Sequence, residues 1–114
     1  MRLKLNISPC PNDTFMFDAM VNSRIDCEGL EFDLSYHDIE VLNDEVLRSL
    51  PDVSKISCAV LPAISEHYRL LDCGAALGRG NGPLLVRRKG ERGALKHIAV
   101  PGEHTTANAL VGRL

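Results

Sequence analysis

Tryptophan is absent from this sequence of 114 residues, and aromatic side chains make up only 4% of it. No apolar run approaches the ~20 residues that a membrane-spanning helix needs, so the sequence indicates no membrane partner. Residues 1–7 begin with a positive charge but lack both an apolar segment and a small-residue cleavage site. A secretory signal is therefore not expected, and the sequence predicts a cytoplasmic location. Charge of neither sign predominates, since 13 Lys and Arg face 15 Asp and Glu, which gives no reason to expect nucleic acid as a partner.

Paired cysteines and clustered histidines are also lacking. The four cysteines form no C-x-x-C pair, and the four histidines show no metal-ligand spacing, so neither a disulfide framework nor a metal site is predicted. Cys58 lies in an apolar stretch and is expected to be a buried, reduced thiol. Cys10 differs because it precedes a predicted helix, whose N-terminus would stabilise a thiolate. A structural role is favoured over a nucleophilic one because no general base accompanies Cys10 in the sequence.

What the sequence does contain is a regular alternation of strand-like and helix-like segments. Strands are predicted at residues 3–7, 30–34 and 53–61. The first two alternate apolar and polar residues, whereas the third is mostly apolar and is expected to be central and parallel. Helical patterns follow each strand: one after Asn12 or Asp13 as N-cap, one after Asp38 that Pro51 stops, and one over 62–71. The order β-α-β-α-β-α predicts a parallel α/β sheet.

A change in composition follows. Residues 74–82 are rich in glycine, and strands are predicted at 83–88 and 98–100 before a helix over 105–114. Gly78, Gly80 and Gly82 precede a strand rather than a helix, which excludes a dinucleotide fingerprint and favours a hinge or a cleft-lining loop. We place a lobe boundary near 88–94, so residues 1–90 form lobe one and 91–114 begin a truncated lobe two. The last β-α unit has no following strand, and a fragment of a longer protein is therefore expected.

Two strand-to-helix turns are candidate binding segments. Residues 8–15 leave a strand, pass two prolines and open a helix, which places free N–H groups at the carboxyl edge of the sheet, where anionic ligands bind. Residues 101–107 repeat this design with Thr105 and Thr106, which either cap the helix or donate to a ligand carboxylate. His104 is next to this pair, but the sequence gives no reason to make it the catalytic base.

The strand beginning at Val53 is a third candidate. Lys55 and Ser57 are expected on one face of it and Ile56 on the other. Polar residues on a central strand suggest the wall of a cleft, although a strand with one polar face would look the same.

These segments are similar to motifs of the 1,4-dihydroxy-6-naphthoate synthases, enzymes of menaquinone biosynthesis by the futalosine route. The motifs are Ser-Pro-Cys-Pro-Asn-Asp-Thr-Phe at 8–15, Lys-Ile-Ser at 55–57, Gly-Ala-Ala-Leu-Gly-Arg-Gly-Asn-Gly-Pro-Leu at 74–84 and Val-Pro-Gly-Glu-His-Thr-Thr-Ala at 100–107. The resemblance implies a type II periplasmic-binding-protein-like fold of two lobes, of which the chain covers lobe one and the first β-α of lobe two. It also implies that Lys55, Ile56, Ser57, Thr105 and Thr106 bind substrate, with no cofactor and no metal.

The activity implied is that of a carbon–carbon lyase. Such an enzyme cleaves cyclic dehypoxanthine futalosine, a small-molecule carboxylate, to 1,4-dihydroxy-6-naphthoate and dihydroxyacetone. The family's proposed proton acceptor is a histidine further along, which no residue here matches, so the catalytic residue is unknown and the isolated chain is expected to be inactive. The alternatives are chorismate dehydratase of the same pathway and a non-catalytic cytoplasmic protein that binds a small carboxylate. A truncated lobe would also expose apolar surface, which predicts a homo-oligomer.

Overall fold

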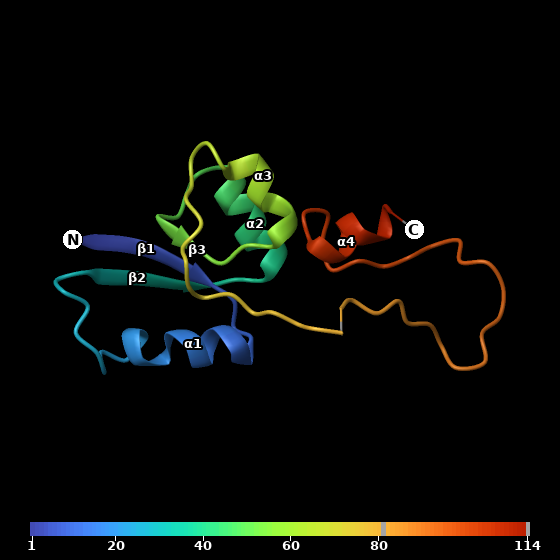
Figure 1. Cartoon of the computed structure of the whole chain (residues 1–114), viewed down its shortest axis with the longest axis horizontal. Helices are drawn as coiled ribbons and strands as arrows, with labels where there is room; N and C mark the ends of the chain where they lie inside the picture. Colours follow the sequence, from blue (N-terminus) through green and yellow to red (C-terminus); the bar gives the residue numbers. More distant parts are fainter. Residues whose placement is uncertain (81, 114) are drawn as a thin grey trace.

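The structure is a computed structural model, and it describes residues 1–80 and 82–113. Strands and helices alternate along the first part of the chain, as the sequence predicts (Figure 1). The elements are β1 (Arg2–Ile7), α1 (Pro11–Val21), β2 (Glu31–Tyr36), α2 (Ile39–Leu47), β3 (Val53–Ser54), the 3-10 turn η1 (Cys58–Val60), α3 (Leu61–Ile64) and α4 (Thr106–Val111).

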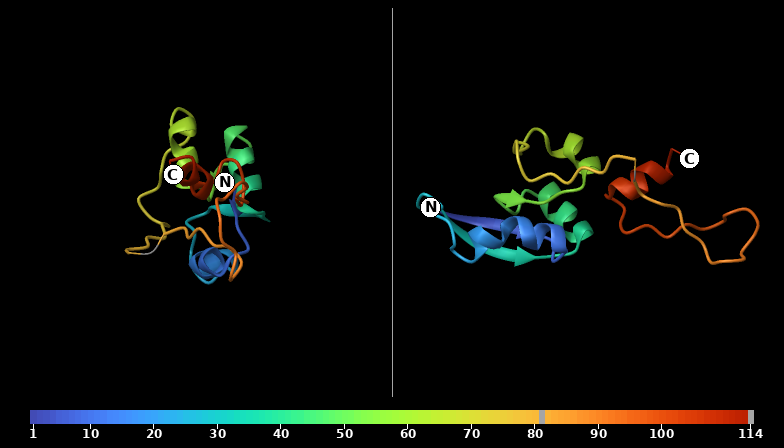
Figure 2. Two further views of the ribbon diagram at one scale, coloured as in Figure 1. Left: turned by 90° about the vertical axis from the view of Figure 1, so that its right-hand side faces the viewer. Right: turned by 60° about the horizontal axis from the view of Figure 1, so that its bottom comes forward.

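The three strands form one sheet in the order β2-β1-β3, and both outer strands run parallel to β1. This confirms the α/β class with a parallel sheet. The sheet is covered on both faces, by α1 on one side and by α2 and α3 on the other (Figures 1 and 2). Leu5 and Ile7 on one face of β1 are fully buried, whereas Arg2 and Lys4 on the other face are exposed, as the alternation of apolar and polar residues predicts. β1 is nevertheless the central strand of the described sheet.

The core lies between the sheet, α2 and α3. Leu42 and Val46 on α2 are buried, and Val46 packs with Val60 and Ile64. Asp38 caps α2, since its carboxylate accepts a hydrogen bond of 3.0 Å from the Glu40 backbone N–H. The predicted cap and the predicted stop of this helix before Pro51 are both confirmed.

Helix α1 begins and packs differently from the prediction. Its N-cap is Cys10, with Pro11 as the first helical residue, rather than Asn12 or Asp13. Asp13 instead turns back towards the end of β1 and is buried. Of its apolar residues, Phe15 and Met16 are exposed, and Phe15 is 87% exposed.

The third strand and the helix after it are shorter than predicted, and β3 lies at the side of β1 rather than at the centre of the described sheet. β3 pairs with β1 only through Leu5↔Val53 and Asn6↔Ser54. The ladder ends there because the Ser57 backbone N–H donates to the Asn43 side chain of α2 instead of to a strand. Residues 58–60 then form η1, so Cys58 is exposed and the expectation of a buried thiol there was wrong.

A long segment without strands or helices runs from residue 65 to residue 105 of the described chain and brings α4 back beside η1 and α2 (Figure 1). The strands predicted at 83–88 and 98–100 do not form. A strand needs a partner for its backbone N–H and C=O groups, and no described strand lies alongside these residues. Asn81 of the glycine-rich motif and Leu114 at the end of the predicted last helix lie outside the described residues. None of the helices in the described part has the length and apolarity that a membrane crossing requires.

Candidate functional site

The opening motif and Lys55 meet at the carboxyl ends of β1 and β3. The Asp13 carboxylate accepts hydrogen bonds from the Ser8 backbone N–H at 3.0 Å and from the Ser8 hydroxyl at 2.8 Å. It also accepts one from the Lys55 ammonium at 3.0 Å. The Asp13 side chain is only 6% exposed and that of Lys55 33%. A partly buried ion pair thus joins the first turn of α1 to the segment after β3.

The two charged groups shift each other's pKa. Burial raises the pKa of the Asp13 carboxyl, but hydrogen bonds from Ser8 and Lys55 outweigh it and hold this pKa below its usual value. Burial lowers the pKa of the Lys55 ammonium, but the hydrogen bond and charge of Asp13 outweigh it and raise this pKa. Both groups are charged at neutral pH.

Cys10 lies at the rim of this cluster. Its sulfur lies 2.8 Å from the Ser8 hydroxyl oxygen, where it competes with Asp13 for the one hydroxyl hydrogen, and 3.6 Å from Lys55 Nζ. The Ser8 hydrogen bond is the main cause that lowers the pKa of the Cys10 thiol, and the Lys55 charge adds to it. The direction of this shift is the predicted one, but its main cause is the Ser8 hydroxyl and not the helix N-terminus that the sequence suggested.

Asn43, a fully buried residue of α2, connects the two predicted substrate-binding segments. Its Oδ1 accepts a hydrogen bond of 2.9 Å from the Ser57 backbone N–H. Its Nδ2 donates to the Ser57 hydroxyl at 3.1 Å and to the His104 carbonyl at 3.3 Å. The chain positions 57 and 104 are thus held side by side by a single amide group.

The two threonines that follow His104 have different surroundings. Thr105 is buried, and its hydroxyl donates to the Gly102 carbonyl at 2.8 Å and accepts from the Asn108 backbone N–H at 3.3 Å. Both functions of this hydroxyl are used within the chain, as the capping interpretation predicts. The half-buried Thr106 hydroxyl accepts from the Ala59 backbone N–H at 3.3 Å, which links α4 to η1.

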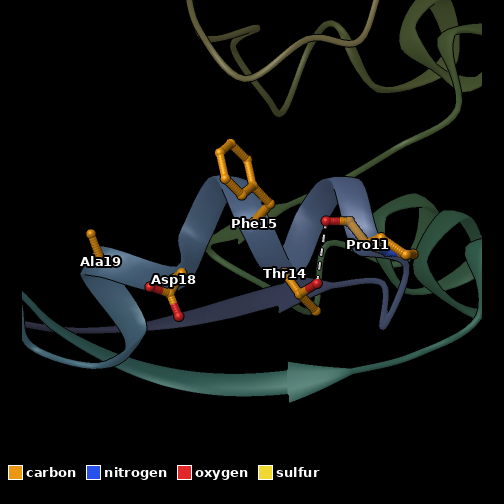
Figure 3. Close-up of a pocket in the computed structure, with 5 residues that line it drawn as sticks. All are labelled: Pro11, Thr14, Phe15, Asp18 and Ala19. Carbon is orange, nitrogen blue, oxygen red and sulfur yellow. Dashed lines mark hydrogen bonds between the residues drawn. The ribbon is translucent and has the colours of Figure 1, made fainter.

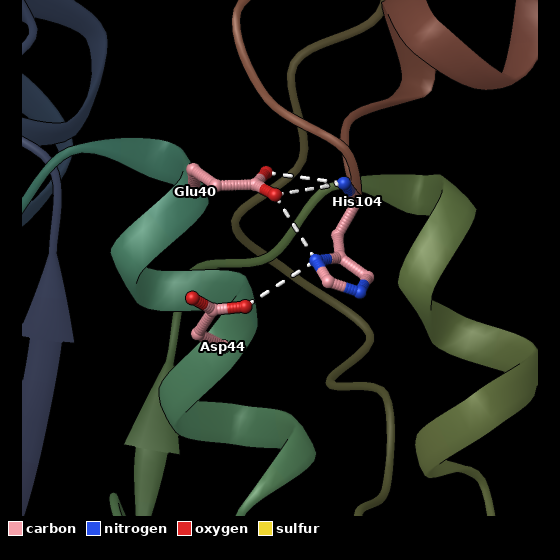
Figure 4. Close-up of side chains that lie close together, drawn as sticks. All are labelled: Glu40, Asp44 and His104. Carbon is pink, nitrogen blue, oxygen red and sulfur yellow. Dashed lines mark hydrogen bonds and ion pairs between the residues drawn. The ribbon is translucent and has the colours of Figure 1, made fainter.

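His104 is held against α2 by two carboxylates (Figure 4). Its Nδ1 lies 3.0 Å from Glu40 and 3.3 Å from Asp44, and Glu40 also accepts from the His104 backbone N–H at 2.9 Å. Burial raises the pKa of the Glu40 carboxyl, but the bonds from His104 outweigh it and lower this pKa overall. Gly102 must lack a side chain here, because a Cβ would overlap the Glu40 carboxylate.

Among the described residues, Glu40, Asp44 and His104 are the one group of His and acidic side chains close enough to share a metal ion. Glu40 and the imidazole are already paired with each other, and the pair explains the arrangement without a metal.

The structure thus places the predicted site residues in two neighbouring groups. Lys55 points to the Ser8 and Asp13 cluster, whereas Ser57 points to Asn43, because the strand that would align them on one face ends at Ser54. Ile56 packs on the apolar core beside Val46. Sequence reasoning missed Asn43, which lies within the α2 pattern. A polar residue between the apolar positions of a helix was the only signal for it.

The surface hollow shown in Figure 3 is separate from these two groups of predicted site residues. It lies on the outer side of α1, where Pro11, Thr14, Phe15, Asp18 and Ala19 line it, and the Phe15 ring points away from the sheet. None of the predicted substrate-binding residues lines it.

Comparison with known proteins bears on the whole chain. A family model described as menaquinone biosynthesis matches residues 3–112. Two relatives named 1,4-dihydroxy-6-naphthoate synthase, from Streptomyces coelicolor and Thermus thermophilus, are 43% and 42% identical over 111 residues. These alignments cover 95% and 96% of this chain but 38% and 40% of the relatives, so the chain spans about two fifths of their length.

A solved structure agrees. The crystal structure of protein AF1704 from Archaeoglobus fulgidus matches with a TM-score of 0.66 and 32% identity, over 69% of this chain and 30% of that one. With a matching family model along nearly its whole length and a parallel α/β sheet that carries the predicted motifs, the chain belongs to the menaquinone-biosynthesis family.

Proposed function

We propose that this chain is the N-terminal part of a 1,4-dihydroxy-6-naphthoate synthase, a cytoplasmic carbon–carbon lyase. The complete enzyme would cleave cyclic dehypoxanthine futalosine to 1,4-dihydroxy-6-naphthoate and dihydroxyacetone. The names of the two relatives support the synthase over chorismate dehydratase. The observation that carries the proposal is the convergence of Ser57 and His104, far apart in the sequence, on the Asn43 side chain.

Two hydroxyl groups in this convergence suit a carboxylate. In the described part of the chain, the Ser57 hydroxyl accepts from Asn43 and the Thr106 hydroxyl accepts from the Ala59 N–H. Each hydroxyl can still donate its own hydrogen, since a hydroxyl is both donor and acceptor. Both side chains are half-buried, and each can therefore reach a ligand at the surface. Hydrogen bonds to a charged carboxylate are worth about 1.5–3 kcal/mol each.

The other predicted binding residues would act on the same ligand indirectly, through the residues that contact it. The Thr105 hydroxyl holds the turn that presents Thr106, and Ile56 anchors the segment of Ser57 in the core. The Lys55 ammonium is bound to Asp13 and holds the first turn of α1 against the segment that contains Ser57.

The proposal includes a type II periplasmic-binding-protein-like fold of two lobes. Residues 1–90 would form lobe one and 91–114 the start of lobe two. The unpaired segments at 83–88 and 98–100 support this division, because they would become strands once the remaining lobe supplied their partners. Closure of the lobes would exclude water while a base from the remaining chain takes a proton from the substrate.

The test is incubation of the full-length protein with cyclic dehypoxanthine futalosine, with chorismate as a parallel substrate. Formation of 1,4-dihydroxy-6-naphthoate and dihydroxyacetone, followed by mass spectrometry, supports the proposal. Dehydration of chorismate would replace it with the dehydratase activity. Saturable binding of the futalosine compound without turnover would show a binding protein instead.

A further inference from the structure

We infer that Asn43 is a positioning residue that sets the distance between the two substrate-binding segments, an inference that rests on the proposed function. No predicted motif contains Asn43, and its side chain is fully buried, so it has no direct access to a ligand. It acts through the residues it holds.

The bonds of Asn43 divide between the two segments. One side of the amide makes a pair of hydrogen bonds with Ser57, through the backbone N–H at 2.9 Å and the hydroxyl at 3.1 Å. The second hydrogen of Nδ2 reaches the His104 carbonyl at 3.3 Å, two residues before Thr106. An amide is the side chain that offers both an acceptor and two donors in this space, and all three functions are used.

This arrangement also orients the Ser57 hydroxyl. Because Asn43 Nδ2 donates to it, the oxygen is occupied as an acceptor and its hydrogen points elsewhere. The Thr106 hydroxyl is held in the same way by the Ala59 backbone N–H, which follows Ser57 in the chain by two residues. Both hydroxyl groups are thus prepared as donors before a ligand arrives. Catalytic groups lose much of their effect when they are misplaced by about 1 Å, so a residue that fixes this spacing affects binding strongly.

Position 43 is determined by its place on α2. It is next to Leu42 and one turn before Val46, which face the core, and one turn after Glu40, which holds His104 from the same helix. The helix thus carries two contacts with the segment of His104, one through Glu40 to the backbone N–H and one through Asn43 to the carbonyl. Only the Asn43 contact also reaches Ser57.

Two variants of the full-length enzyme separate the contact of Asn43 with Ser57 from its contact with the segment of His104. Asn43→Leu has a similar size and removes every hydrogen bond. Asn43→Asp keeps an acceptor for the Ser57 N–H but has no hydrogen to donate, so it loses the bonds to the His104 carbonyl and to the Ser57 hydroxyl and leaves the Ser57 backbone held. The control is Val46→Ala, which lies on the same helix, creates a small cavity and removes no hydrogen bond to either segment, although the core that it loosens also packs against Ile56.

Steady-state kinetics with cyclic dehypoxanthine futalosine is the first readout. We expect Asn43→Leu to raise KM about ten-fold or more and to change kcat less. The variant disturbs the groups that bind the substrate and leaves the groups that carry out the reaction in place. Val46→Ala should lower the melting temperature without this rise in KM. Equal KM values for Asn43→Leu and Val46→Ala would overturn the inference.

Amide hydrogen exchange of the same proteins is the second readout, and it needs no activity. Asn43→Leu should speed exchange at both Ser57 and the amides of 105–108, and Asn43→Asp at 105–108 alone. Uniformly faster exchange, as in Val46→Ala, would show a merely structural role. If the wild-type enzyme neither turns over nor binds the futalosine compound, the proposed function fails, while the exchange pattern still decides whether Asn43 couples the two segments.

Discussion

Replacement of Asp13 by Asn tests whether the cluster at the start of α1 holds the first turn of this helix to the sheet. Asp13 accepts three hydrogen bonds, two from Ser8 and one from Lys55. The substitution keeps the shape of the side chain but removes its charge. It leaves the Lys55 ammonium, with a side chain 33% exposed, without its partner.

The expected loss follows from this burial. Breaking a fully buried ion pair costs about 3–5 kcal/mol, because it leaves an uncompensated charge. Lys55 reaches solvent in part, which lowers the cost, so we expect the free energy of unfolding to fall by about 2–3 kcal/mol. Asp18→Asn on the same helix is the matched control. Its partner Arg24 is 65% exposed, and such surface pairs contribute about 0–1 kcal/mol.

Urea unfolding of the full-length protein at neutral pH measures both variants. A double-mutant cycle with Lys55→Met then isolates the coupling between Asp13 and Lys55. If Asp13→Asn and Asp18→Asn lower the free energy of unfolding equally, the cluster is no more than a surface ion pair and our reasoning is refuted.

The same cluster predicts a pH dependence. The folded pKa of Asp13 is lowered, so its stabilisation is complete above the unfolded pKa of about 3.9 and is lost as pH falls through the folded value. The folded pKa of Lys55 is raised, so its stabilisation is complete below about 10.4 and is lost as pH rises through the folded value. The wild type should therefore lose more stability than Asp13→Asn between about pH 4 and pH 2.

Three further predictions concern the other residues of the site and the chain as a whole. Thr105→Ala should lower the free energy of unfolding by about 1 kcal/mol through loss of a helix cap, whereas Thr106→Ala should weaken substrate binding by about 1.5–3 kcal/mol. Calorimetry and urea unfolding of the full-length variants separate the two effects, and equal binding by Thr106→Ala and wild type would contradict the role of Thr106. Alkylation of Cys10 by iodoacetamide should have a rate midpoint below the usual thiol pKa of about 8.5, and a Lys55→Met variant should move it upward; a midpoint at or above that value would contradict the thiolate. The 114-residue chain on its own should form no naphthoate and should associate, because large apolar side chains such as Phe15 are exposed; naphthoate above a heat-killed control, or a clean monomer in the ultracentrifuge, would contradict it.

Local pattern determined the helices and strands whose signals are contained within a few residues. Asp38 before an apolar helical stripe predicted the start of α2, and alternation at residues 3–7 and 30–34 predicted β1 and β2. The first β-α turn was recognisable because prolines and a thiol at a helix start have direct local consequences. The family was recognisable for the same reason, since its motifs are short and contiguous.

The tertiary structure decided every feature that needed a partner from elsewhere in the chain. The Lys55 N–H still donates to the Asn6 carbonyl of β1, but pairing stops beyond it because the Asn43 side chain, fourteen residues away in sequence, takes the Ser57 N–H. The segments at 83–88 and 98–100 have strand-like sequences but no strand beside them within residues 1–80 and 82–113. Asn43 itself became visible as a connection between Ser57 and His104 only when the chain had folded, because its three hydrogen bonds join positions that no local pattern relates. Secondary-structure propensity depends on residues that are close in sequence, whereas buried polar groups find hydrogen-bond partners from distant parts of the chain. The spacing of the candidate site depends on those long-range hydrogen bonds.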